Sequence, residues 1–263
     1  MNEYIVFSIV FIYGILIGSF LNVCIFRIPE ESSIIVGRSH CMSCNKPIKW
    51  YDLIPIFSYI FLGGKCRSCK SKISIQYPII EALNGLLYVL VFYLYGWNHL
   101  YEIILSSAYC LVISALIVLS LIDFRTNIIP VGINIFILIM GLVVVLVKYF
   151  WYGHNTYIVI EHLVGFCIVS GFLLLIFLAS HGRDIGGGDI KLMAAAGLVL
   201  GWELVLFAFF LGCVLAAIIH PIRMKISHLN RVLAFGPYLS VGIVVSILYG
   251  KQIVDWYLQT FFI

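Results

Sequence analysis

The sequence predicts an all-α polytopic membrane protein of about eight transmembrane helices, one of them short, with a small cytoplasmic metal-binding loop domain. Of the 263 residues, 63% are hydrophobic and only 11% are charged, whereas soluble domains are about 45–50% apolar and about 25% charged. The mean hydropathy of +1.10 indicates the same class. One soluble core cannot bury this much apolar surface, but lipid can solvate it, so the chain is best divided into membrane crossings.

The first apolar run covers residues 4–26 and is too long for the core of a cleavable signal peptide, and Glu3 stands where basic residues would precede one. At about 1.5 Å per residue it can cross a hydrocarbon layer of about 30 Å. Residues 190–200 are also apolar but would extend only about 16–17 Å as a straight helix. They are expected to form a half-helix, a crossing of thin membrane or a re-entrant segment. Further helices are expected at 78–95, 101–122, 128–150, 157–180, 202–220 and 236–250.

The positions of the basic residues predict the orientation in the membrane. If 190–200 counts as a crossing, 14 of the 16 Lys and Arg residues fall on one side, and only Lys148 and Lys251 fall on the other. The positive-inside rule makes the basic side cytoplasmic and the N-terminus external. Basic loops beside anionic lipid account for the net charge of +4, so no nucleic-acid partner is expected. The expected division is a first helix at 1–26, a cytoplasmic loop at 27–77 and a membrane domain at 78–263.

Two CxxC pairs in the loop 27–77 predict a metal site. They consist of Cys41, Cys44, Cys66 and Cys69. Four thiolates can close a tetrahedral shell around Zn²⁺ with no open position, which is typical of a structural site. A metal would also explain how a loop with little apolar core folds. A redox or disulfide role remains the alternative, although a reducing cytosol disfavours it. The other four cysteines lie in apolar helices, where cysteine behaves as a small hydrophobic residue.

Two aspartates at the expected membrane edge are the candidates for chemistry. Asp123 closes the third apolar run, and Asp189 follows Gly186, Gly187 and Gly188 where the short segment begins. The crossing count places both at the same face. Two neighbouring carboxyl groups can share a proton, so that one acts as acid and the other as base. The glycines allow positive φ or the close approach of another segment.

Each acid also has a simpler interpretation. Asp123 can be a solvated charge paired with Arg125, and Asp189 an ordinary acid in the first turn of a helix. Asp184, in the same loop, is interpreted as solvated or paired with its neighbour Arg183. Glu81 lies inside an apolar run, where an ionisable group is costly, although it is close enough to the end to reach water.

Together these residues resemble the type IV prepilin peptidase family of leader peptidases/N-methyltransferases. The similarity runs in order over nearly the whole chain: Gly18–Val23, Arg27–Pro29, Arg38–Cys41 with the paired cysteines, Gly64–Arg67, Tyr77–Glu81, Ile122-Asp123, Gly188–Leu192 with Ala194-Ala195, and Phe235–Tyr238.

The resemblance implies that Asp123 and Asp189 are the catalytic pair of an intramembrane aspartyl peptidase in the bacterial cytoplasmic membrane. It implies cleavage of prepilin or pseudopilin leaders after a glycine, and methylation of the new N-terminal amine with S-adenosylmethionine. Lys191 is expected to support the pair, together with the three glycines. The candidates for the methyltransferase step are Gly18, Asn22, Arg27, Gly64, Lys65 and Glu81; no Rossmann fingerprint for the methyl donor accompanies them.

The chain departs from the family pattern at Val131, where an acidic or amide residue is common, at Met42-Ser43, where a proline is usual, and at Asp184, where glutamate is frequent. No proposed aspartate or cysteine is affected. The alternatives are another peptidase with the same glycine–aspartate motif, which would lack the four-cysteine loop, a transporter or channel with gating carboxylates, and a structural membrane protein with a zinc loop. A transporter predicts ionisable residues near the bilayer midplane, whereas here they gather at the edges.

Overall fold

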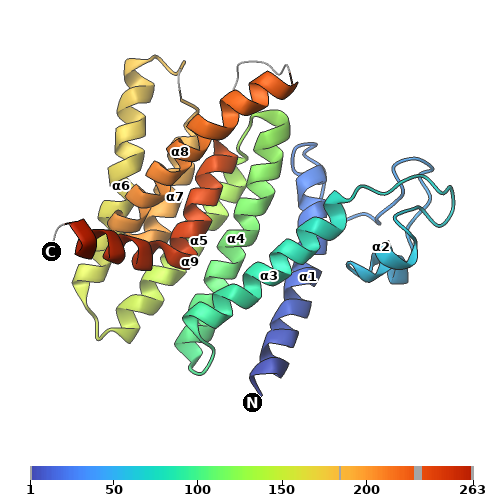
Figure 1. The fold of residues 1–263 in the computed structure, drawn as a ribbon, viewed down its shortest axis with the longest axis horizontal. Coiled ribbons are helices and arrows are strands. Elements are labelled where there is room, and N and C mark those ends of the chain that lie inside the picture. The colour runs from blue at the N-terminus through green and yellow to red at the C-terminus, as the bar shows by residue number, and fades with distance from the viewer. Residues whose placement is uncertain (1, 184, 228–232, 262–263) are drawn as a thin grey trace. The chain divides into compact units, whose positions relative to one another are not determined.

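The computed structural model describes residues 2–183, 185–227 and 233–261 and is entirely helical in these ranges, apart from turns and two isolated β-bridges (Figure 1). Seven of the helices are long and apolar enough to cross a membrane. The bounds are α1 Glu3–Arg27, η1 Trp50–Leu53, α2 Phe57–Phe61, α3 Gln76–Tyr95, α4 Leu100–Thr126, α5 Val131–Trp151, α6 Thr156–Ala179, α7 Gly187–Leu200, α8 Trp202–Ser227 and α9 Gly236–Phe261. The predicted fold class is confirmed.

The chain forms two compact units, Met1–Leu94 and Tyr95–Ile263. In the first unit, α1 packs closely against α3 through glycines. A Cβ at Gly14 would lie 2.7 Å from the Gly85 Cα, and one at Gly18 would lie 2.7 Å from the Glu81 Cα. Asn84 Nδ2 donates to the Gly14 carbonyl at 2.8 Å. Two glycines four positions apart let helices approach without a side chain between them, as at many membrane-helix interfaces.

The second unit is a bundle in which the short helix α7 is central. Figure 1 shows α7 among α5, α6 and α8, and it packs against these three helices and α9. Eight of its 14 residues are buried, including the whole run Ala195–Leu200. This helix corresponds to the segment 190–200, whose predicted length is too short for an ordinary membrane crossing. The surrounding helices, rather than lipid, cover most of its surface.

Close backbone contacts and one side-chain hydrogen bond fix α7. A Cβ at Gly197 would lie 2.0 Å from the Gly165 carbonyl oxygen of α6, so only glycine fits this crossing. Near its C-terminal end, His162 Nδ1 of α6 lies 2.8 Å from the Leu198 carbonyl oxygen. The last carbonyls of a helix lack partners within it, and the buried imidazole supplies one. The C-terminal part of α7 is therefore held against α6.

Candidate active site and metal centre

Asp123 lies in the last turn but one of α4 and is buried, with 4% of its surface exposed. Its Oδ2 accepts a hydrogen bond from the Gly236 backbone N–H at 2.9 Å. Gly236 is the first residue of α9, and a helix N-terminus carries partial positive charge that favours an anion. The C-terminus of α4 is unfavourable to a carboxylate, but the N-terminus of α9 compensates. The structure thus gives Asp123 a backbone partner at the start of α9.

Asp189 lies in the first turn of α7, and the fold brings it to Asp123 although the two are 66 positions apart in the sequence. Their carboxyl groups are close enough to interact electrostatically. A backbone hydrogen bond from Gly186 also reaches the Asp189 carboxyl group, while its Oδ1 is buried without a hydrogen-bond partner among the described residues. The bundle therefore holds two interacting carboxyl groups, one of which has a free oxygen.

The three glycines before Asp189 serve close approach rather than unusual backbone angles. Gly186 has φ −75°, and Gly187 and Gly188 are already helical, so positive φ is not their role here. A Cβ at Gly188 would lie 2.8 Å from the Ile129 Cβ, in the connection that follows Asp123's helix. The neighbouring Gly187 has no such obstacle within 4 Å. Gly188 thus lets the α4–α5 connection lie directly against the start of α7.

Two residues that support the pair were not singled out from the sequence. Asn134 Nδ2, in the first turn of α5, donates to the Gly188 carbonyl at 3.2 Å. Gly236 is the second, because a Cβ there would lie 2.7 Å from Asp123 Oδ2. Gly236 belongs to the Phe235–Tyr238 motif quoted for the family resemblance, which is the signal that points to it. Nothing in the local sequence marks Asn134.

Lys191 and Arg125 are exposed, so the structure supplies no buried cation beside the pair from these two positions. Asp184 lies outside the described residues. Among the described residues, no contact between Lys191 and the two carboxyl groups supports its predicted role.

The four cysteines of the loop form a separate cluster in the first unit. Their Sγ atoms all lie within 4.8 Å of one another. The Sγ atoms of Cys41 and Cys69 are 3.8 Å apart, which equals the edge of a tetrahedron with metal–sulfur distances of about 2.3 Å, roughly 3.8 Å. All four are free thiols. The cluster has the ligand set and spacing to hold a metal ion.

The two CxxC turns have the same backbone geometry. The Cys41 N–H donates to the Lys46 carbonyl and the Cys66 N–H to the Ser71 carbonyl, in each case five residues on. The residue after each second cysteine, Asn45 or Lys70, has positive φ, 54° and 60° respectively. Each turn thereby points two sulfur atoms in one direction. This repeated pattern builds the cluster from two local units.

The two thiols of the first CxxC turn differ in acidity. Backbone hydrogen bonds from Ser43 and Cys44 lower the pKa of Cys41 to about 6. The pKa of Cys44 is raised to about 11, because a backbone hydrogen bond from Lys46 lowers it less than desolvation and the thiols of Cys69 and Cys41 raise it. Four thiolates so close together repel one another. A bound cation removes this repulsion and releases the remaining protons.

Three of the six methyltransferase candidates meet where α1 contacts α3. The close approach of Gly18 to Glu81 is described above, and Asn22 Nδ2 donates to the carbonyls of Gly18 and Tyr77 at 3.3 and 3.4 Å. Glu81 is 6% exposed, and its Oε2 accepts from the Ile56 backbone N–H at 2.7 Å. Glu81 therefore does not extend to water; it fastens the loop before α2 to α3.

Of the other three candidates, Arg27 is the last residue of α1, and Gly64 and Lys65 lie in the loop that follows it. Arg27 donates to the carbonyls of Ser33, Val36 and Gly37 at 2.8, 3.1 and 3.3 Å. Gly64 has φ +65°, which favours glycine. Lys65 forms a β-bridge with Lys72 beside the second CxxC turn. All six candidates belong to the first unit, and each has a structural contact.

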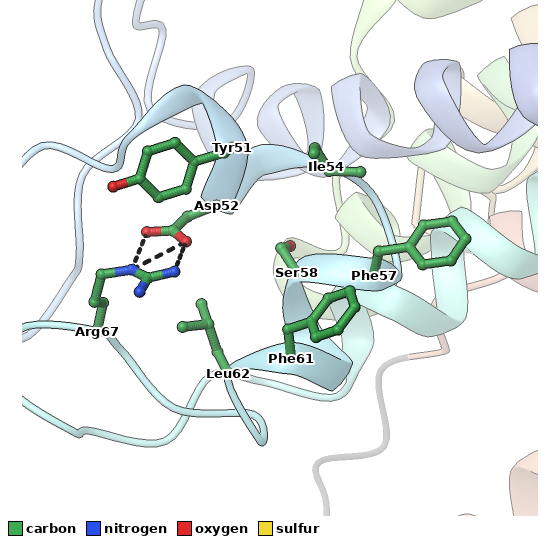
Figure 2. Close-up of a pocket in the computed structure, with 8 residues that line it drawn as sticks. All are labelled: Tyr51, Asp52, Ile54, Phe57, Ser58, Phe61, Leu62 and Arg67. Atoms are coloured by element: carbon green, nitrogen blue, oxygen red, sulfur yellow. Dashed lines mark hydrogen bonds and ion pairs between the residues drawn. The ribbon is translucent and has the colours of Figure 1, made fainter.

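A shallow cavity of about 220 Å³ is also found in this unit, lined by residues of η1, α2 and the second CxxC turn (Figure 2). At one end Arg67 makes a bidentate ion pair with Asp52, with Nη2 2.6 Å from Oδ1 and Nε 2.9 Å from Oδ2. Arg67 lies above the Tyr51 ring, with Cζ 5.3 Å from its centroid. The pair ties η1 to the second cysteine turn.

Comparisons with known proteins find a family match in each of the two units of the chain. Residues 12–95 match the Bacterial Peptidase A24 N-terminal domain, and residues 110–220 match the Type IV leader peptidase family. The chain is 33% identical to the prepilin leader peptidase/N-methyltransferase of Bacillus subtilis, over 96% of this chain and 98% of that protein. It is 31% identical to the protein of the same description from Aeromonas salmonicida, over 97% and 94% of the two chains.

No solved structure matches the chain. Full-length similarity to these relatives, together with the two family matches, is nevertheless sufficient for assignment. The chain belongs to the type IV leader peptidase family.

Proposed function

We propose that this protein cleaves the leader peptides of type IV prepilins or pseudopilins after a glycine, with Asp123 and Asp189 as its catalytic pair, and then methylates the new N-terminal amine. The names of its relatives support both activities. The observation that carries the assignment of residues is the meeting of two acids from α4 and α7 within one helical bundle.

In the proposed reaction one carboxyl group is ionised and the other protonated, as neighbouring carboxyl groups favour. The carboxylate takes a proton from water, whose oxygen bonds to the scissile carbonyl carbon, while the protonated group gives its proton to the carbonyl oxygen. The C–N bond of the tetrahedral intermediate then breaks: the leaving amine takes the proton that the first carboxyl group had accepted, and one hydroxyl of the intermediate returns its proton to the other carboxylate, which restores the pair. Asp189 Oδ1, which has no hydrogen-bond partner within residues 2–183, 185–227 and 233–261, is available to water or substrate.

The ends of the helices suggest where the reaction takes place. Asp123 is close to the C-terminal end of a candidate membrane span, and Asp189 begins a helix that is not one of those spans. A site at the membrane edge lets water enter while the hydrophobic helix of the substrate stays in lipid. With the basic loops on the cytoplasmic side, this edge faces the cytoplasm of a bacterial cell and the N-terminus is external, which requires α7 to count as a crossing.

We assign Zn²⁺ to the four cysteines, since an all-thiolate tetrahedral set is typical of structural zinc. The metal would fold the segment 27–77, which is associated with methylation, whereas 78–263 carries the peptidase. S-adenosylmethionine would supply the methyl group. Gly18, Asn22 and Glu81 would contribute by holding α1, α3 and the loop together, and Arg27, Gly64 and Lys65 by shaping the loop.

The experiment is cleavage of a model prepilin by the purified full-length protein in lipid, with the products identified by mass spectrometry. We expect Asp123→Asn and Asp189→Asn to lose cleavage while Asp184→Asn, in the same loop as Asp189, retains it. Adding S-adenosylmethionine should add one methyl group to the mature product of the wild type. Normal cleavage by either of the first two variants excludes the proposed pair, and failure of the wild type on several prepilins excludes the activity.

A further inference from the structure

The short helix α2 has an exposed apolar face that continues from the rim of the cavity. Phe57, Ile60 and Phe61 occupy one side of this helix at spacings of three and four residues and are 55%, 66% and 85% exposed. Ile54, one turn earlier, is 43% exposed. The polar Ser58 is only partly exposed. A helix that faces water shows the opposite pattern, with its polar side outward.

Figure 2 shows Phe57 and Phe61 on the side of the cavity away from the Asp52–Arg67 ion pair. A contiguous exposed apolar surface of this kind marks an interaction site. We call the side chains of Ile54, Phe57, Ile60 and Phe61 the α2 stripe.

The hydrogen bond from Ile56 N–H to Glu81 fixes the depth of the stripe relative to α3. Glu81 lies five residues after Gln76, where α3 begins, which is about 7.5 Å along the helix axis. Since α3 is a candidate membrane span, a segment fastened at Glu81 lies level with its first turns. The α2 stripe is thus held at the depth of the membrane–water boundary and not out in the solvent.

The charge around the stripe suits an anionic surface. Residues 27–77 contain eight Lys or Arg and three Asp or Glu. Trp50, at the start of η1, is 78% exposed, and tryptophan prefers the interface between headgroups and acyl chains. Exposed apolar and aromatic side chains beside basic residues are the composition of helices that lie in the plane of a membrane surface.

We propose that the α2 stripe is a membrane-docking surface that inserts into the headgroup region of the adjacent leaflet, with the basic residues of the loop against anionic lipid. Insertion is expected to reach about 5–10 Å into the boundary between headgroups and acyl chains. This surface would hold the metal-binding loop against the bilayer. The proposed docking does not depend on either of the two enzymatic activities.

The test is photo-crosslinking of the full-length protein in lipid nanodiscs, with benzoylphenylalanine in place of single residues. We expect Phe61→benzoylphenylalanine and Phe57→benzoylphenylalanine to form lipid adducts on irradiation. Met42→benzoylphenylalanine is the matched control, because Met42 is 75% exposed but lies in the polar first CxxC turn. We expect no lipid adduct at position 42.

Mass spectrometry of the adducts separates the possible occupants of the stripe. Lipid adducts at positions 57 and 61, enriched in phosphatidylglycerol over its share in a mixed phosphatidylcholine–phosphatidylglycerol disc, support the proposal. Adducts to another part of this chain or to a second copy, or equal lipid labelling at position 42, overturn it. An unchanged metal content of each variant shows that the loop is still folded, so that absence of lipid adducts at 57 and 61 also counts against the proposal.

Discussion

The four-cysteine cluster and the aspartate pair are built in opposite ways. The cysteines lie in one loop, the outermost two 28 positions apart, and two similar turns aim their sulfur atoms. The aspartates come from two helices, and each is placed by residues remote in sequence: Asp123 by Gly236, 113 positions away, and the start of α7 by Asn134, 54 positions from Gly188. The first site depends on local backbone geometry and the second on the packing of the bundle.

Because of this difference, we expect a variant that damages one site to leave the other site intact. Loss of a ligand in the cluster should unfold a loop, whereas a change at a helix crossing should displace a carboxyl group by a fraction of an ångström. Single substitutions at each site can separate these cases.

The largest effect is expected from Asp189→Asn, which removes one member of the proposed pair and keeps the size of the side chain. Cleavage of a model prepilin should fall by about 10²–10⁴-fold, the usual contribution of a general acid or base. Metal content, measured by atomic spectroscopy on the same sample, should not change. A parallel loss of metal would show that the two sites are coupled and would contradict their independence.

Next is Cys66→Ser, which leaves three thiolates and removes one corner of the tetrahedron. We expect loss of the stoichiometric metal and rapid proteolysis between residues 27 and 77, because binding energy at such sites is folding energy. Limited proteolysis with mass mapping, and metal analysis, are the measurements. Cys110→Ser, at a buried position away from the cluster, is the control and should keep its metal.

Gly236→Ala should disturb Asp123 without changing any titratable group. The added Cβ would lie 2.7 Å from Asp123 Oδ2, and a displacement of about 1 Å can cost about 10²-fold in rate. Gly132→Ala is the matched control, since a Cβ there meets nothing within 4 Å. The readout is kcat for prepilin cleavage at saturating substrate. Equal rates for the two variants would contradict the role given to Gly236.

The smallest effect is expected at the glycines before Asp189. Gly188→Ala places a Cβ 2.8 Å from that of Ile129, and a small shift of the connection to α5 would relieve part of the clash. Cleavage should fall by less than in Gly236→Ala. Gly187→Ala, one residue earlier and unobstructed, should keep the wild-type rate. If both variants lose activity equally, backbone flexibility rather than close approach explains the glycines.

Much of the fold could be predicted because hydrophobic runs of sufficient length have few alternatives to membrane helices. The runs at 78–95 and 101–122 correspond to α3 and α4, and the short segment 190–200 to most of α7. The charge-based orientation stays a prediction. Positive φ at the glycines of 186–188 was expected as one possibility and is not observed, because Gly187 and Gly188 already belong to the helix.

The candidate site could be predicted in part. Both aspartates were identified from motif and position at a helix end, but their partners were not. A backbone N–H such as that of Gly236 carries no side-chain signal, and Asn134 differs in no local way from other polar residues near helix ends. Glu81 was singled out because it lies inside an apolar run, yet its partner, the Ile56 N–H, lies 25 positions away.

The class of the protein, the number of long apolar helices and the two CxxC turns follow from the sequence alone. These depend on composition, on length against the thickness of a bilayer and on spacings of a few residues. Only the tertiary structure decided that α7 is enclosed by its neighbours, that Asp123 meets the N-terminus of α9 beside Asp189, and that the α2 stripe is left uncovered. Such features depend on contacts between residues far apart in the chain, where a hydrogen bond or a missing Cβ acts only after the helices have packed.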